Sequence, residues 1–227
     1  MADPQKPAPT KSPGRKAAPT RASARRPVPY AGEANRRAIL EAALQVFSAL
    51  GFEGASTRAI AAAAGIEQGH LAYYFPSKEA LWREVIETFA REAEGLVRHA
   101  VTPESLARPL ETARMLLPRF LGIFADQPRM TRLMLQEFSL TSPRHNWLVE
   151  NFGRPVWLHI RPLFEALREL GLLSGAPAEV AYFNLVAGAM IVFGNADVLR
   201  TIAGIDPARE AFRAQTIEYL LSPVFHH

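Results

Sequence analysis

The stretch that decides the fold is residues 57–78, which read TRAIAAAAGIEQGHLAYYFPSK. Small and apolar residues recur through it at helical spacing and are interrupted at Gly65, which separates two short helical segments. Glycine suits this turn because it has no Cβ to clash when φ is positive. Ile66 and Leu71 would face inward and leave the opposite, polar side of the second segment free. The stretch therefore predicts a helix-turn-helix, whose second helix has the shape that enters the DNA major groove.

Capping signals bound the helices on either side of this stretch. Gly51 ends the first helix, Ser56 or Thr57 caps the second, and Ser77 caps the fourth. The predicted spans are about 33–50 for the first helix, 68–74 for the third and 78–100 for the fourth.

The rest of the chain also has a helical pattern, punctuated by Pro and Gly and without convincing strand alternation. The predicted helices there are 104–126, with kinks at Pro109 and Pro118, then 128–140, 144–170, 177–199 and 207–221. The sequence thus predicts an all-α chain with an N-terminal three-helix helix-turn-helix domain and a larger helical domain. Its predicted parts are a basic arm (1–30), a DNA-binding domain (31–77), and a ligand-binding and dimerisation domain (78–227) joined to it by the fourth helix.

The same residues resemble the DNA-binding segment of the tetracycline-repressor family of bacterial regulators. The resemblance lies first in seven residues between 57 and 68, which are Thr57, Arg58, Ala61, Gly65, Ile66, Glu67 and Gln68. It continues in residues 71–81, which follow the pattern LxYYFxSKEAL. It covers about residues 36–86 and is specific, because many spaced positions match together. It implies a ligand-responsive transcriptional regulator, most often a repressor, that binds a palindromic operator as a homodimer and is released by a small-molecule effector.

The outward side of the third helix carries the groups that would touch DNA. An amide at its first turn, Gln68, can pair with adenine N6 and N7. The resemblance implies that Gln68 and Arg58 read bases and that Lys78 binds phosphate. Tyr73 and Tyr74 are interpreted as surface residues, although both can also be core aromatics. The predicted DNA-binding residues are Thr57, Arg58, Gln68, Gly69, His70, Tyr73, Tyr74 and Lys78.

The C-terminal half should supply a dimer surface and an effector pocket. The last two long helices are apolar around much of their circumference, which favours burial against a second copy. Aromatic and Met side chains with a few polar anchors predict the pocket, although such a set at helical spacing is also typical of ordinary core. The predicted pocket residues are Phe120, Phe124, Met134, Phe138, Trp147, Trp157, His159 and Asn184.

Composition limits the classes of protein that fit. The 227 residues contain no Cys, which excludes disulfides and thiolate chemistry, and no apolar run reaches the ~18 residues of a membrane span. A cytoplasmic protein without membrane partners is therefore expected. Residues 1–30 hold seven of the 26 Lys and Arg but only one of the 22 Asp and Glu, and we expect them to be disordered. A DNA-contacting basic arm and a solubilising leader both fit this composition.

Other functions remain open at this point. No metalloprotease, nucleophile-elbow or phosphate-loop motif occurs, so we predict no catalytic residue, metal or cofactor and no enzyme activity. A helical adaptor that has lost DNA binding is a second alternative, and the retained Gln68, Arg58 and Lys78 argue against it. The fold does not distinguish repressor from activator. The sequence also leaves open the effector, the operator, and whether His226 and His227 are native or the remnant of a tag.

Overall fold

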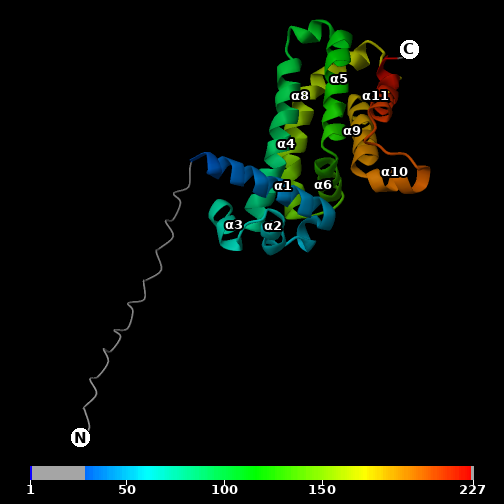
Figure 1. Cartoon of the computed structure of the whole chain (residues 1–227). Helices are drawn as coiled ribbons and strands as arrows, with labels where there is room; N and C mark the ends of the chain where they lie inside the picture. Colours follow the sequence, from blue (N-terminus) through cyan, green and yellow to red (C-terminus); the bar gives the residue numbers. More distant parts are fainter. Residues whose placement is uncertain (2–28, 226–227) are drawn as a thin grey trace.

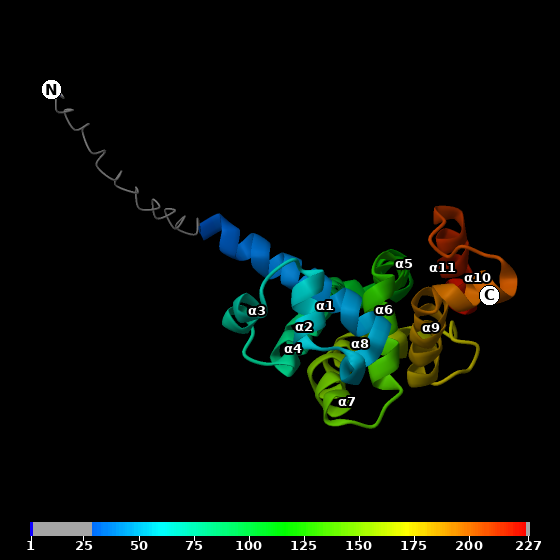
Figure 2. The ribbon, with the colours of Figure 1, turned by 60° about the horizontal axis from the view of Figure 1, so that its bottom comes forward.

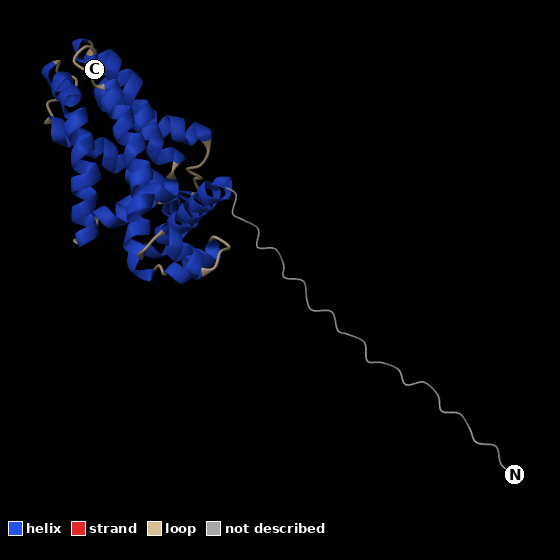
Figure 3. Ribbon diagram, turned by 90° about the vertical axis from the view of Figure 1, so that its left-hand side faces the viewer, coloured by secondary structure: helices blue, strands red, loops and turns tan. Residues whose placement is uncertain are grey.

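The protein is a bundle of helices. A computed structural model describes Met1 and residues 29–225, and this part of the chain contains no strand (Figure 3). The all-α prediction is confirmed. The helices are α1 (Pro29–Gly54), α2 (Thr57–Ala63), α3 (Gln68–Tyr74), α4 (Lys78–Ala100), α5 (Pro109–Asp126), α6 (Pro128–Phe138), α7 (Pro143–Leu148), α8 (Arg154–Glu169), α9 (Ala178–Gly194), α10 (Ala196–Ala203) and α11 (Glu210–Phe225).

The first three helices form an N-terminal head beneath the longer helices. Long helices α4, α5 and α8 run side by side, and α1 crosses them at one end, where it contacts α4 and α6 (Figure 1). α9 and α11 pack together on the far side of the molecule from α3 (Figure 2). Because α4 begins in the head and ends among the long helices, it connects the two parts directly.

One hydrophobic core runs through both parts. The ring of Phe52, after the break in α1, meets Trp82 of α4 edge-on at 6.3 Å, and Trp82 meets Trp147 of α7 at 5.5 Å. Further along α4, Phe89 packs against Phe124 of α5 with ring centroids 6.1 Å apart. These contacts bury apolar surface between the head and the long helices, so the two parts stabilise each other.

Local signals set the helix boundaries in the head as predicted. Ser56 Oγ accepts a hydrogen bond from Ala59 N at 3.1 Å, and Ser77 Oγ accepts one from Ala80 N at 3.0 Å. Gly51 has φ 68° and breaks α1, although helical turns continue to Gly54. The first helix starts at Pro29, earlier than predicted. The predicted disorder of the basic arm and the question of His226 and His227 fall outside the described residues.

The predicted spans in the C-terminal half need four corrections. Pro109 does not kink a helix but begins α5, where its missing N–H costs nothing, and a 3₁₀ turn (Ser105–Ala107) precedes it. The span 144–170 is divided by a π turn (Val149–Gly153) into α7 and α8. The span 177–199 ends at Gly194, after which the chain bends by 73° into α10. The last helix, α11, starts and ends later than predicted.

The last residue of α9 packs closely on α6. A Cβ on Gly194 would lie 3.3 Å from the backbone N of Arg132, a tight contact that glycine avoids. No single helix in the described ranges has the length and apolarity needed to cross a membrane. α9 and α10 have that length and apolarity only when they are taken together as a bent pair.

Candidate nucleic-acid interface

Helices α2 and α3 form the predicted helix-turn-helix. Gly65 takes φ 66° at the turn, and Ile66 N donates to Ala61 O at 3.0 Å, which closes the end of α2. Ile60 and Ala61 of α2 and Leu71 of α3 are buried against each other and the head. Leu71 is the only buried residue of α3, so the rest of this helix is available for contacts.

The exposed side of α3 carries most of the predicted DNA-binding residues. Gln68, Gly69, His70 and Tyr73 are all exposed, and the side chain of Tyr73 is 84% accessible. No atom lies within 4 Å of the position that a Cβ on Gly69 would occupy, so nothing in the protein itself requires glycine there. The absence of a side chain instead lets a large partner approach the backbone of α3.

The N-termini of α2 and α3 lie together at one edge of this surface. The amide Nε2 of Gln68 donates to Thr57 Oγ1 at 3.4 Å, a long hydrogen bond between exposed groups. Arg58, next to Thr57, is exposed and pairs with no other group in the described part of the chain. The amide of Gln68 and the hydroxyl of Thr57 therefore lie close together at this edge, and the guanidinium of Arg58 is free to meet a polar partner.

Tyr73 and Tyr74 differ in their surroundings. Their rings meet edge-on at 5.4 Å, but Tyr73 faces solvent whereas Tyr74 is half-buried against the core. The surface interpretation thus fits Tyr73 fully and Tyr74 in part.

Lys78 has partners within the protein. Its ammonium donates to the carbonyls of Phe52 at 2.8 Å and Ala55 at 3.0 Å, and it lies 4.2 Å from the centroid of the Phe52 ring. These contacts hold the end of α1 against the start of α4. An ammonium has three N–H groups, so one stays available, and a phosphate contact by Lys78 remains a prediction.

Comparison with known proteins identifies this region. The family model "Bacterial regulatory proteins, tetR family" matches residues 39–85, which contain the end of α1, the whole helix-turn-helix and the start of α4. Residues 39–85 therefore form a DNA-binding segment of the tetR type. The matched residues include all eight that were predicted to bind DNA.

The curated relatives of this chain are named as regulators. The HTH-type transcriptional regulator RutR of Escherichia coli (strain K12) is 33% identical over 117 residues, which are 50% of this chain and 52% of RutR. The HTH-type transcriptional repressor KstR of Rhodococcus jostii (strain RHA1) is 32% identical over 124 residues, 55% of this chain and 57% of KstR. The chain thus spans about half the length of the curated relatives it matches.

Solved structures share the fold over most of the chain. A putative fatty acid metabolism regulator of Clostridium perfringens aligns with TM-score 0.62 and 19% identity, covering 82% of this chain and 96% of that one. HlyIIR, a hemolysin II transcriptional regulator, aligns with TM-score 0.60 and 18% identity, covering 82% and 97%. At these identities the likeness establishes the helical architecture.

The predicted effector pocket is largely filled by the side chains expected to line it. Phe120 and Phe124 are buried and pack edge-on at 5.7 Å, and Trp157 packs on Tyr182 at 5.0 Å. His159 Nδ1 lies 2.7 Å from the carbonyl O of Pro155 within its own helix. The remaining predicted pocket residues are buried (Met134), half-buried (Phe138 and Trp147) or exposed (Asn184). Most of these side chains pack into the core, and ligand contact by them remains a prediction.

Two cavities lie elsewhere. One, of about 760 Å³, lies between α4 and α5 and contains none of the predicted pocket residues. The other, of about 340 Å³, lies between α9, α11 and the loop before α9, and contains one of them, Asn184. No periodic pattern in the sequence indicates the first cavity, because its lining comes from two helices and includes both charged residues and glycines.

The sequence also left undetected two arginines that hold the head in place. Arg36 of α1 donates to Glu84 of α4 at 2.8 Å and lies over the Phe75 ring at 5.2 Å. The hydrogen bond from Arg36 is the main cause that lowers the pKa of the Glu84 carboxyl. The second arginine, Arg144 of α7, reaches back to the end of α1. Both pairs are far apart in sequence, so no local pattern reveals them.

Proposed function

We propose that the protein is a ligand-responsive transcriptional repressor that binds a palindromic operator as a homodimer. The observation that carries this proposal is the exposed polar side of α3, which starts at Gln68 beside Thr57 and Arg58. A helix held out in this way by one buried anchor, Leu71, fits the major groove.

The proposed DNA contacts divide into two kinds. Gln68 and Arg58 read bases, because a glutamine amide pairs with adenine and a guanidinium with guanine O6 and N7. Gly69 lets the helix approach, and His70 adds one hydrogen bond. Contacts with phosphate fix the register of the protein on the duplex. The proposed phosphate contacts are Thr57, Tyr73, Tyr74 and Lys78.

Two heads are needed because one such module makes few base contacts. In a two-fold dimer the recognition helices lie ~34–36 Å apart, one turn of DNA. The apolar side chains of Val180, Phe183 and Ile191 on α9 and Tyr219 on α11 are exposed and supply a surface for the second copy. Met190 and Phe193 of the same helix are buried in their own chain, so only one side of α9 serves this contact.

The proposed response passes through α4. An effector that binds one arrangement of α4 better than another shifts the spacing of the two heads and so the affinity for the operator. KstR is named a repressor, which supports the proposed sign of regulation. The matched relatives are regulators rather than enzymes, which supports a protein without catalytic activity. The proposed parts keep the predicted bounds of 31–77 for DNA binding and 78–227 for effector binding and dimerisation.

The test is Gln68→Ala on a duplex selected by the wild-type protein from a random pool. We expect a loss of ~1–3 kcal/mol in binding free energy, confined to one base position, because a bidentate contact is removed. Fluorescence anisotropy on the selected duplex and on its single-base variants measures this. Gln45→Ala, which removes an exposed glutamine of α1 outside the helix-turn-helix, is the matched control.

Two outcomes contradict the proposal. If Gln68→Ala discriminates between selected and scrambled duplexes as well as wild type does, Gln68 does not read a base. If the wild-type protein binds no duplex even at low salt, where phosphate contacts are strongest, the proposed function is wrong.

A further inference from the structure

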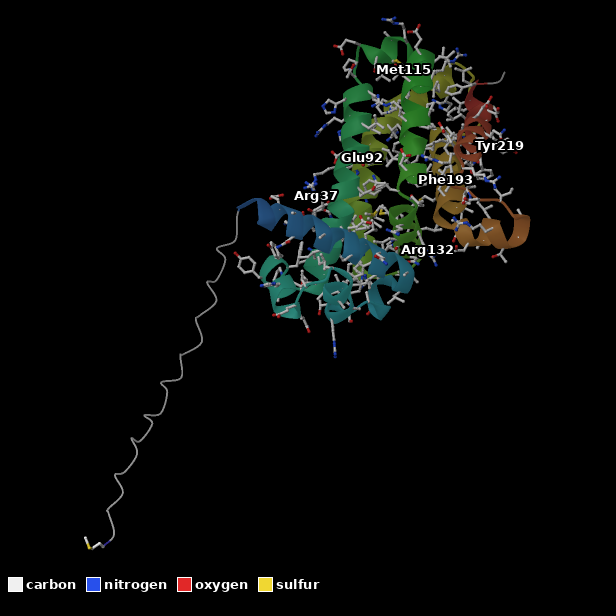
Figure 4. All side chains as sticks on the ribbon, viewed as in Figure 1. Arg37, Glu92, Met115, Arg132, Phe193 and Tyr219 are labelled. Atoms are coloured by element: carbon white, nitrogen blue, oxygen red, sulfur yellow. The ribbon has the colours of Figure 1, made fainter. Side chains whose placement is uncertain are left out.

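The proposed DNA contacts leave the groove between α4 and α5 unexplained. The two helices run side by side in Figure 1, and the open groove between them has a volume of about 760 Å³. Glu92, which lines the groove, is marked on α4 in Figure 4. The other lining residues are Gly95, Leu96, His99 and Ala100 of α4, and Arg119, Gly122, Ile123 and Asp126 of α5.

Two glycines keep this groove open. Gly95 and Gly122 lie within regular helices, and no atom lies within 4 Å of where a Cβ would stand on either. Each costs roughly 0.5–1 kcal/mol of helix stability relative to alanine. Gly194 differs, because a Cβ there would meet the backbone of α6. Gly95 and Gly122 therefore serve neither a turn nor a close helix contact, and their structural effect is to leave space between α4 and α5.

The groove has opposite charges at its two ends. The side chains of Glu92 and Asp126 are at one end, where Gln127, next to Asp126, donates to Glu92 Oε2 at 2.7 Å. Because α5 runs antiparallel to α4, His99 and Arg119 share the other end. Seven residues of α4 separate Glu92 from His99, a distance of about 10 Å at the helical rise of 1.5 Å per residue. Leu96, Ala100 and Ile123 line the space between the two ends with aliphatic surface.

The charged groups retain capacity for a ligand. Arg119 is exposed and has no hydrogen-bond or ion-pair partner among the described residues, so all five of its N–H groups are available. His99 Nδ1 donates to the Gly95 carbonyl at 2.6 Å, so Nε2 is unoccupied and donates to a carboxylate when the ring is an imidazolium. Glu92 and Asp126 each have one partner, Gln127 and Arg213, and a carboxylate accepts several hydrogen bonds.

We propose that this groove binds an elongated aliphatic zwitterion and that its occupancy changes affinity for the operator. The ammonium of the ligand would lie at Glu92 and Asp126, its carboxylate at Arg119 and His99, and its chain along Leu96 and Ile123. The regulatory half of this inference rests on the proposed function. That half follows from the position of the groove. The ligand would join α5 to α4, which starts in the head. It would also compete for Asp126 with Arg213 of the proposed dimerisation helix α11.

The first experiment measures binding without DNA. The probe is 8-aminooctanoate, whose charged ends are about 10 Å apart when extended and so match the groove. Octanoate and octylamine, which each lack one charge, are the ligand controls. Isothermal titration calorimetry on the full chain should show binding of the zwitterion and at least about tenfold weaker binding of either control, because a charged hydrogen-bonded end is lost.

Variants locate the site. Gly122→Leu fills the groove where an added Cβ meets no atom, so the fold should persist while the probe no longer binds. Gly32→Leu makes the same change at an open helical glycine of α1 and should bind the probe as wild type does. Arg119→Gln should weaken the probe about tenfold and leave octylamine unaffected, since only a carboxylate contact is lost. If the probe does not bind the wild-type chain, or binds Gly122→Leu equally well, the groove is not its site.

The second experiment adds the selected operator duplex. The probe should change operator affinity of the wild-type protein at least about threefold and leave that of Gly122→Leu unchanged. If the probe binds the wild-type chain and operator affinity stays the same, the regulatory half is overturned. If no duplex binds but the probe still does, the proposed function fails while the ligand site stands.

Discussion

Arg144 is the residue through which the C-terminal helices hold the end of α1. Its guanidinium pairs with Glu137 of α6 at 3.3 Å and with Glu53 at 3.2 Å, and it lies 3.9 Å from the centroid of the Phe52 ring. The Glu137 side chain is only 2% exposed. Burial raises the pKa of the Glu137 carboxyl, and the charge of Arg144 opposes this rise. Arg144 thus compensates a buried carboxylate and stacks on the head at the same time.

We expect Arg144→Ala to lower the free energy of unfolding by about 3 kcal/mol at pH 7.5, because Glu137 is left buried without its partner. The loss should be smaller at pH 5. A carboxyl whose pKa is raised on folding binds its proton more tightly in the folded chain, so it favours folding at low pH and loses this contribution as pH rises through the folded pKa. Urea unfolding at both pH values measures the difference.

Arg154→Ala is the matched control for this pair. Arg154 and Glu150 form an exposed pair screened by solvent, so removing it should leave the free energy of unfolding almost unchanged at both pH values. An Arg144→Ala protein that loses the same stability at pH 5 as at pH 7.5 would show that Glu137 is not the group left uncompensated.

At the scale of elements, the turn between α2 and α3 depends on the backbone of Gly65. With φ 66°, it takes a conformation that costs a residue with a Cβ about 1–2 kcal/mol. Gly65→Ala should therefore lower the free energy of unfolding by about 1 kcal/mol, although its Cβ would have open space. Gly69→Ala in α3, where φ is ordinary, should leave stability equal or higher. Equal stability of both variants in chemical denaturation would contradict this account of the turn.

The helices of the head were predictable because their ends depend on nearby residues. Ser56, Gly65 and Ser77 act within three or four positions of themselves, and each does what the sequence indicated. The end of α9 at Gly194 was missed, and the close contact of this glycine is with the backbone of α6, more than sixty residues earlier. The π turn before α8 left no recognisable pattern. One continuous helix was therefore predicted where the structure has two, both for α7 with α8 and for α9 with α10.

The site was predictable to a similar degree. The exposure of Gln68 and Tyr73 follows from the helical period around Leu71, so the outer side of α3 was evident from sequence. Aromatic residues such as Phe120 and Phe124 follow the same period whether they line a pocket or fill a core, and here they pack on each other. The groove escaped prediction because Gly95 and Gly122 line the same space only after α4 and α5 pack.

At the scale of the whole molecule, the head and the expected dimer surface lie at opposite sides (Figure 2). α4 and α5 lie between them (Figure 1). α4 begins in the head, where it contacts α1, and α5 contacts α11, in part through the pair of Asp126 and Arg213. The proposed repressor needs this arrangement, because its effector must alter the relation between two heads that are joined only through the dimer.

Phe183 of α9 tests this arrangement. Its side chain is 60% exposed within one chain, so Phe183→Glu should leave the monomer folded while placing a charge in an apolar contact between copies. We expect the dimer dissociation constant to rise at least about a hundredfold, and operator binding to weaken with it, because the paired heads are lost. Sedimentation equilibrium and anisotropy measure these two changes, and circular dichroism confirms the fold. Leu140→Glu, an exposed leucine outside α9–α11, should remain dimeric. A Phe183→Glu protein that stays dimeric would exclude this side of α9 from the interface, and the geometry that spaces the two heads would then have to come from another surface.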